Sequence, residues 1–315
     1  MLIRLPRKVK TILSYLNPSN QFTRDYFESL LPPIRLHSWG GLGSQLFALN
    51  AYFQIRNKYP GRRIRLLHHT GGVTRREFEL EIVDLPVVIV EDYTDIKLDS
   101  ITSKARVKKS IKVKIRGLFR KLLLVSGFFA SANNEGEFSQ MRRWVIEIRG
   151  HYTRLQISPN YLTKIDALVF STLYGIPRVT HLENAICIHL RLGDLATEKR
   201  GSLVNPKALR KEIDKLPPSK SIFVFSDSSA HEMQTYLGLQ RPLLFIEESN
   251  TAKVILMSST SKVFIGSNSK ITFWITAIRA HRQVDGVSII PSNIYDWLIE
   301  VLHESLRIGQ DIRYY

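Results

Sequence analysis

The sequence predicts an α/β protein made of two halves, each containing parallel strands. Between residues 33 and 69, a strand, a glycine-rich turn, a helix and a second strand follow one another. This order is that of a βαβ unit, which favours a parallel sheet with right-handed crossovers. After residue 180, five short apolar segments alternate with stretches that suit helices. A chain of 315 residues with 44% hydrophobic residues accommodates two domains with buried cores.

The first half begins with a predicted strand at 33–37. A helix is expected from about Gln45 to Tyr59, because Leu46, Leu49 and Phe53 share one face and Pro60-Gly61 ends the pattern. The remaining elements of this half are a buried strand at 63–69, a loop at 133–137 and a strand at 144–150.

The second half is predicted to contain five strands, at 185–194, 221–227, 242–247, 262–266 and 287–290. Helices are expected at 206–216 and 270–281, and an amphipathic helix at 293–308 closes the chain. The boundary between the halves is expected near residues 175–180, which gives domains 1–178 and 179–315.

Charge is concentrated in two short stretches. The chain has 45 Lys and Arg against 28 Asp and Glu, a formal net charge of +17. Four basic residues lie in 1–10 and nine in 103–121, with no acidic residue in either stretch. The second stretch continues into the apolar run 122–130, and this combination is typical of a helix in a membrane interface. Segment 103–130 is therefore predicted to face an anionic membrane; the alternative is a solvated charged loop beside a core helix.

Several classes of protein are excluded by composition. The single cysteine, Cys187, cannot form an intrachain disulfide, which fits a reducing compartment. The longest apolar run, 122–132, is shorter than the roughly 20 residues of a spanning helix. The basic N-terminus has no apolar stretch typical of a secretory signal. We expect a cytoplasmic protein that associates peripherally with a membrane.

Polar clusters follow four of the predicted strands, at the end where open parallel sheets bind ligands. The first is the turn at 40–45 (GGLGSQ), whose glycines let backbone N–H groups approach an anion at a helix N-terminus. Glycines in such a turn also occur for purely steric reasons. The fourth cluster, Gly266 to Lys270, again separates a strand from a helix and is similar to a second anion cradle.

The second and third clusters add charged side chains. His189 and Arg191 point to one face of their strand, and the planar guanidinium of Arg191 suits a phosphate. Asp194 could orient either of them, or form a structural Arg–Asp pair. Asp227, between Ser226 and Ser228, could contact a nucleotide base or ribose, or it could cap the following helix.

Taken in order, the segments GGLGSQLF, HLRLGD, VFSDS and LMSSTSKVFIGSNSKITFW resemble the motifs of the α-1,2-fucosyltransferases, glycosyltransferase family 11, within the α-1,2/α-1,6/protein O-fucosyltransferase superfamily. The resemblance covers most of residues 34–280. It implies a GT-B fold, with two Rossmann-like domains facing each other across a cleft. The first would be the acceptor-side domain and the second would bind the nucleotide sugar. It further implies an inverting transferase that uses GDP-fucose without a metal.

The resemblance also implies roles for individual residues. Arg191 would hold the β-phosphate of the donor, and Asp227 would help to read the nucleotide. The loop donors to the diphosphate would be Ser267, Asn268 and Ser269. The residues lining the cleft from the first domain would be Gly41, Gly43, Ser44 and Gln45. The family pattern has Asn where this chain has Ser44, and a second Trp where it has Ile275.

The residues support this chemistry independently. The chain contains no Asp-x-Asp sequence, so Arg191, helped by Lys270, is expected to stabilise the leaving diphosphate in place of a metal. An inverting transfer also needs a base for the acceptor hydroxyl. His189 and Asp194 lie close to Arg191 in sequence and are the candidates, but either could be structural, and the base is left unassigned. The adjacent His68 and His69 have no Cys or acidic partner at ligand spacing and are interpreted as a strand-end pair without a metal.

The resulting prediction is an enzyme that transfers fucose from GDP-fucose to a hydroxyl of a cell-surface polysaccharide or lipid-linked glycan, such as an O-antigen or capsule. Its partners would be the donor, the glycan acceptor and an anionic membrane surface, with no cofactor and no nucleic acid. The same fold with another nucleotide sugar is one alternative. A basic nucleic-acid-binding protein is the other, although the basic run lacks aromatics interleaved at stacking intervals.

Overall fold

The computed structural model describes residues 28–71, 76–80, 82, 85–91, 125–170, 173, 182–192, 205–239, 241–308 and 311–315. The chain forms two compact units. The first contains the described residues up to Leu155, except that Leu42–Leu46 and Glu79–Ile82 pack with the second, which continues from Gln156 to Tyr315. The basic stretches 1–10 and 103–121 lie outside the described residues.

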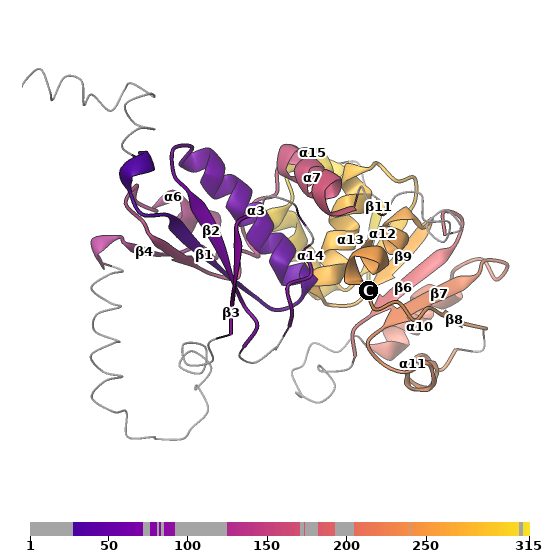
Figure 1. Ribbon diagram of the computed structural model, residues 1–315. Helices are drawn as coiled ribbons and strands as arrows, with labels where there is room; N and C mark the ends of the chain where they lie inside the picture. Colours follow the sequence, from indigo (N-terminus) through magenta and orange to yellow (C-terminus); the bar gives the residue numbers. More distant parts are fainter. Residues whose placement is uncertain are drawn as a thin grey trace, which may run out of the picture. The chain divides into compact units, whose positions relative to one another are not determined.

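The first unit is built on a five-stranded sheet in which every pair is parallel, with strand order β3-β2-β1-β5-β4 (Figure 1). Its strands are β1 (Ile34–Trp39), β2 (Ile64–His69), β3 (Val87–Val90), β4 (Phe129–Ser131) and β5 (Glu147–Arg149). Its helices are α3 (Leu42–Lys58), whose first five residues pack with the second unit, and the short α6 (Glu135–Ser139). The βαβ order predicted for residues 33–69 is confirmed by β1, α3 and β2.

The strand β2 differs from its prediction as a buried strand. Burial alternates along it, so that Ile64 and Leu66 are buried while Arg65 is exposed. The neighbouring β1 alternates at the same positions, with Leu36 buried and Arg35 exposed. The sheet therefore has one face of mainly apolar side chains and one face that carries polar side chains, among them Arg35 and Arg65. The prediction of a buried strand is therefore wrong for Arg65, while Leu67 and His69 on the same face are half-buried.

The second unit contains a six-stranded parallel sheet of order β11-β10-β9-β6-β7-β8 (Figure 1). Its strands are β6 (Ile186–Leu190), β7 (Ile222–Ser226), β8 (Leu244–Phe245), β9 (Val263–Gly266), β10 (Val287–Ile290) and β11 (Asp311–Tyr314). Its helices are α7 (Pro159–Ile165) with the π-turn η1 (Asp166–Phe170), α10 (Pro206–Asp214), α11 (Ala230–Leu237), α12 (Thr251–Thr260), α13 (Lys270–His281), α14 (Ser292–Val301) and α15 (Glu304–Ile308). Two parallel sheets with intervening helices confirm the predicted α/β class.

The prediction of a single helix at 293–308 is wrong, because α14 ends at Val301 and Leu302 has an extended backbone. The carbonyl of Val301 accepts from the N–H of Ile157, and the N–H of His303 donates to the carbonyl of Ile157. These bonds form an isolated parallel bridge between Ile157 and Leu302, which uses backbone groups that a continuing helix would need. The amphipathic pattern resumes in α15 and is followed by β11, which the sequence reasoning did not anticipate.

Within the described parts of the chain, none of the helices is both long and apolar enough to cross a membrane.

A fully buried arginine holds the α13 side of the second sheet together. The guanidinium of Arg279 donates to the hydroxyl of Ser288 at 3.0 Å and to the carbonyls of Ser261 at 2.5 Å and Val287 at 3.2 Å. Burial lowers the pKa of Arg279 to about 10, which leaves it charged at neutral pH. One side chain on α13 thereby satisfies backbone groups that flank β9 and β10.

We expect Arg279→Met to destabilise the protein by about 3 kcal/mol or more, because it leaves buried carbonyls without donors. Urea unfolding followed by circular dichroism measures the change. The matched control is Arg313→Met, since Arg313 is exposed and its ion pair with Asp311 is at the surface. That control should change the free energy of unfolding by less than about 0.5 kcal/mol. Equal effects from the two substitutions would contradict the role given to Arg279.

Candidate functional site

The second sheet reverses its direction of growth between β6 and β9. Counted from β6, the order across the sheet from β8 to β11 is 3-2-1-4-5-6. The chain leaves β6 toward β7 on one side, while β9 lies on the other. In open parallel sheets a crevice forms at the carboxyl ends of strands that flank such a reversal, and ligands bind there. His189 pairs directly with Gly266 at this point, so two of the predicted clusters meet.

Backbone groups after β6 are held by side chains that follow its two neighbours. The N–H of Arg191 donates to Ser267 Oγ at 3.2 Å, from the loop after β9. The N–H of Leu192 donates to Asp227 Oδ1 at 2.8 Å, from the loop after β7. The Nε of Arg191 lies 4.0 Å from Asp227 Oδ2. The structure thus brings the second, third and fourth predicted clusters together around one strand end.

The sequence left structural roles open for two carboxylates, Asp227 as a helix cap and Asp194 as a partner of Arg191. The helix after β7 is capped by Ser229, whose side chain forms a capping box with Glu232, so Asp227 is not the cap. Asp194, considered as a partner of Arg191, lies outside the described residues. In the part of the chain that is described, the carboxylate near Arg191 is that of Asp227.

The loop between β9 and α13 is held in place by close packing. A Cβ on Gly266 would lie 2.2 Å from the Thr272 methyl carbon, so only glycine fits there. Ser269 caps α13 by accepting from the Thr272 N–H, and the Ser267 N–H donates to Thr272 Oγ1 at 3.0 Å. The hydroxyl of Tyr315 donates to the Gly266 carbonyl at 2.6 Å. Asn268 lies half-buried between the two serines. The loop is therefore pre-shaped at the N-terminus of a twelve-residue helix.

The first predicted cluster joins this site through α13. The indole Nε1 of Trp274 donates to the Gly43 carbonyl at 2.9 Å, and the Nζ of Lys270 donates to Ser44 Oγ at 2.8 Å. A Cβ on Gly43 would lie 2.9 Å from Lys270 Cβ, which explains the glycine. Sequence reasoning expected Gly43 and Ser44 on the first domain, whereas they pack with the second unit.

The other two residues of that cluster have different surroundings. Gln45 is fully buried, and its Oε1 accepts from the Glu79 N–H at 2.8 Å. Gly41 belongs to the first unit and precedes α3 as its N-cap residue, with an extended backbone. Their predicted place in the binding cleft stays a prediction.

The electrostatics of the site favour a bound anion. Burial, together with the nearby charge of Arg191, lowers the pKa of Lys270 to about 8. An anion placed against these two cations would offset their repulsion and raise the pKa of Lys270 again. Two cationic side chains beside a helix N-terminus form an environment suited to phosphate.

His189, near the carboxyl end of β6, is a neutral imidazole at neutral pH. Burial lowers its pKa to about 4, an effect to which Arg191 adds and which Asp227 opposes. Its Nδ1 is buried and has no hydrogen-bond partner among the described residues. A neutral imidazole offers one donor and one acceptor without adding charge.

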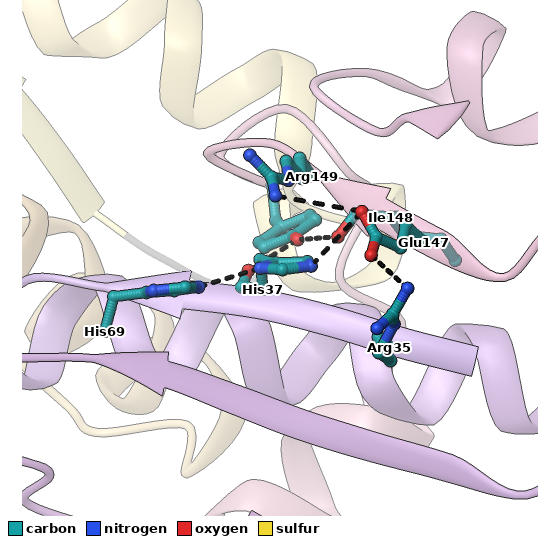
Figure 2. A network of polar contacts seen from close by, with 7 residues as sticks. Arg35, His37, His69, Glu147, Ile148 and Arg149 are labelled. Carbon is teal, nitrogen blue, oxygen red and sulfur yellow. Dashed lines mark hydrogen bonds and ion pairs between the residues drawn. The ribbon is translucent and has the colours of Figure 1, made fainter. Parts of the chain in front are cut away.

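The first unit carries a second polar cluster, on the polar face of its sheet. Figure 2 shows His37 of β1 between His69 of β2 and Glu147 of β5. His37 Nδ1 lies 2.7 Å from His69 Nε2, so one imidazole donates to the other. His37 Nε2 is 3.9 Å from the Glu147 carboxylate, which also forms ion pairs with Arg35 and Arg149. This cluster was not predicted from the sequence, because its members belong to three different strands. His37 and Glu147 alone are 110 positions apart in the chain.

Aromatic side chains lie at the carboxyl ends of β1 and β5, which flank the reversal of the first sheet. Trp39 and His151 meet edge-to-face with ring centroids 5.4 Å apart. Next to them, Tyr152 has a left-handed backbone with a φ of 56°, which is uncommon for a residue with a side chain. Its hydroxyl donates to the His37 carbonyl at 2.6 Å, and burial raises its pKa above the ordinary range. This hydrogen bond and complete burial hold the strained residue in place.

The adjacent histidines His68 and His69 project to opposite faces of β2. His68 Nδ1 lies 3.3 Å from Ser38 Oγ, whereas His69 contacts His37. In the described residues there is no group of three or more His, Cys, Asp and Glu side chains that could hold a metal ion.

Comparisons with known proteins give matches in structure alone. No family model matches the chain, and no curated protein matches it in sequence. The structure of fucosyltransferase NodZ from Bradyrhizobium is 14% identical with a TM-score of 0.40, over 79% of this chain and 93% of NodZ. The heptosyltransferase WaaC of E. coli with ADP is 11% identical with a TM-score of 0.41, over 90% and 93%. A putative UDP-N-acetylglucosamine 2-epimerase from Listeria monocytogenes is 11% identical with a TM-score of 0.45, over 82% and 79%. At these scores the function has to be argued from the residues of this chain.

We expect anion binding at this site to weaken as the pH rises through the pKa of Lys270. An anion binds more tightly to the charged amine, and the free protein loses that charge near pH 8. Sulfate suits the test because its own charge is constant in this range. Its affinity, measured by thermal shift, should fall by about tenfold between about pH 7 and about pH 9.

The matched variant is Lys270→Met, which keeps the length of the side chain and removes its charge. This variant should bind sulfate weakly at both ends of the range. A pH dependence as steep as that of the unmodified protein would show that another group is responsible.

Proposed function

We propose that this protein is a glycosyltransferase that binds a nucleotide-sugar donor at the carboxyl ends of β6 and β9. The observation that carries the proposal is the grouping of Arg191 and Lys270 at the N-terminus of α13, beside the reversal of a parallel sheet. A diphosphate is the ligand that such a group fits best, because it offers several oxygens and at least two negative charges. The hydroxyl and amide groups of Ser267, Asn268 and Ser269 would supply further donors.

The reaction proposed is a single displacement with inversion, without a metal. The oxygen of the acceptor hydroxyl forms a bond to the anomeric carbon, while the bond from that carbon to the diphosphate oxygen breaks and its electron pair leaves with the diphosphate. Charge grows on the leaving oxygen, so fixed cations and N–H donors nearby lower the barrier. Arg191 and Lys270 would have this role.

A general base must take the proton of the acceptor hydroxyl. A pKa of about 4 makes His189 a weak base, and proton transfer is most efficient when the pKa lies near the working pH. His189 therefore suits a hydrogen bond to the diphosphate better than proton abstraction. Asp194, the other candidate from the sequence, lies outside the described residues.

For the substrates we keep the more specific interpretation that the sequence motifs imply. The donor is GDP-fucose, with Asp227 helping to hold the nucleotide. The acceptor is a hydroxyl of a cell-surface polysaccharide or lipid-linked glycan. An acceptor would bind at the carboxyl ends of β1 and β5, where Trp39 and His151 offer aromatic surface beside the polar cluster of His37 and Glu147. The enzyme would work at the cytoplasmic face of a membrane, in association with anionic lipid.

Arg191→Ala should lower the rate of sugar transfer by at least about 100-fold, because it removes a cation aimed at the leaving diphosphate. Release of GDP from GDP-fucose in the presence of acceptor glycan measures the rate. Arg313→Ala is the matched control: it removes an exposed arginine of the same unit that also lies near a carboxylate. The control should keep full activity. Transfer that survives in Arg191→Ala with an intact fold would refute the role of Arg191.

A panel of nucleotides separates the donor hypotheses. A ligand that binds only the folded state raises the melting temperature with concentration. GDP and GDP-fucose should stabilise the protein, whereas UDP, ADP, CMP and their sugars should give no shift at the same concentration. If another nucleotide gave the largest shift, the fold and reaction class would stand and the donor would change. If no nucleotide bound and DNA or RNA bound instead with strong salt dependence, the enzyme proposal would be wrong.

A further inference from the structure

Exposed aromatic and basic side chains gather at one end of the first sheet. Val125 is 80% exposed, Phe128 40% and Trp144 42%, and Arg142 and Arg143 are also exposed. The first two precede β4 and the other three precede β5, which is the neighbouring parallel strand. All five therefore lie at the amino end of the β4–β5 edge. We call them the β4–β5 patch.

The segment that presents this patch is fixed from inside the unit. Tyr59 and Arg62, which follow the end of α3, are almost fully buried. Their side chains donate to four backbone carbonyls of residues 141–145. The acceptors are Met141 and Arg142 for the hydroxyl of Tyr59, and Arg143 and Val145 for the guanidinium of Arg62. The exposed side chains thus stand on a rigid backbone, so their exposure does not result from a loosely held loop.

Contacts within the patch hold its two halves together. The indole Nε1 of Trp144 donates to the Ser126 carbonyl at 2.8 Å. Gly127 has a φ of 81°, and a Cβ there would lie 2.6 Å from Arg142 Cδ, so this arginine packs against the turn. The guanidinium of Arg142 lies over the Trp144 ring, with its Cζ 5.4 Å from the ring centroid. Trp144 and Arg142 are therefore held together at the surface, with the exposed Arg143 between them in sequence.

We propose that the β4–β5 patch docks this protein on an anionic lipid bilayer, with Trp144 and Phe128 in the interface and Arg142 and Arg143 at the lipid phosphates. The inference rests on the membrane association in the proposed function and assigns it to particular residues. Tryptophan and arginine side chains with polar ends and apolar bodies suit the headgroup region. The patch has no acidic residue, and the sequence of nine basic and no acidic residues at 103–121 ends four positions before Val125. An anionic surface complements this charge.

The position of the patch is compatible with acceptor binding at the opposite end of the first sheet. It lies at the amino ends of β4 and β5, whereas ligands of open parallel sheets bind at the carboxyl ends. Docking through the patch would leave the carboxyl edge of the first sheet open to an acceptor.

Vesicle flotation with the full chain tests the proposal. The unmodified protein should float with vesicles of phosphatidylcholine and phosphatidylglycerol, and remain unbound with phosphatidylcholine alone. Phe128→Ser with Trp144→Ser should weaken partitioning by at least about tenfold. Arg142→Gln with Arg143→Gln should weaken it by roughly fivefold for each charge removed, and high salt should have a similar effect.

The matched control is Val88→Ser with Ile89→Ser. These two apolar residues are 43% and 48% exposed on β3, at the opposite edge of the same sheet. The control should float like the unmodified protein, and circular dichroism checks that every variant is folded. Equal loss in patch and control variants, or no loss in the patch variants, would overturn the proposal. So would loss of a dimer in the patch variants with unchanged flotation, since the patch would then be an interface between two copies of this chain.

The binding of GDP is measured in the same samples by thermal shift. Flotation that depends on the patch, without nucleotide binding, would leave the docking surface standing and contradict the proposed enzyme. Nucleotide binding without flotation would support the proposed enzyme and contradict the docking surface.

Discussion

The candidate donor site depends on the pairing of β6 with β9. This pairing joins His189 to Gly266 across 77 positions of sequence and places the loop after each strand beside the other. It works only because residue 266 lacks a side chain, since Thr272 fills the space that a Cβ would need. Thr272 is also the residue that binds the Ser269 cap and the Ser267 N–H. One close approach therefore fixes the strand register, the start of α13 and the loop that joins β9 to this helix.

Basic residues have two physically different roles in this chain. Arg279 and Arg62 are buried and donate to backbone carbonyls, so their charge is dispersed within the fold. Lys270 also lies in a low-dielectric setting, but the nearest charge that affects its pKa is another cation, Arg191. The repulsion between Lys270 and Arg191 does not stabilise the fold, and a bound anion would relieve it. The pair is therefore evidence for an anion-binding site. The net charge of +17 does not distinguish these roles, because both kinds of residue contribute equally to it.

The sequence predicted the strands of the second unit well and its donor-site clusters in outline. Short apolar runs bounded by polar turns are local signals, and α13 occupies the predicted range 270–281. Features that depend on distant contacts were not predictable. The bridge between Ile157 and Leu302 divides a helix whose amphipathic pattern is continuous, and β11 has exposed residues that give no strand signal. The packing of Gly43 and Ser44 with the second unit, and the cluster around His37, likewise depend on residues far apart in sequence.

Parallel strands give each sheet two chemically different ends, and both units use this difference. At the carboxyl ends, loops lead into helix N-termini, as at α13, or into strained turns such as that at Tyr152. At the amino ends, chain segments enter the strands, and their side chains can serve attachment without disturbing that chemistry. The β4–β5 patch fits this division, because the residues that hold it, Tyr59 and Arg62, lie where α3 ends.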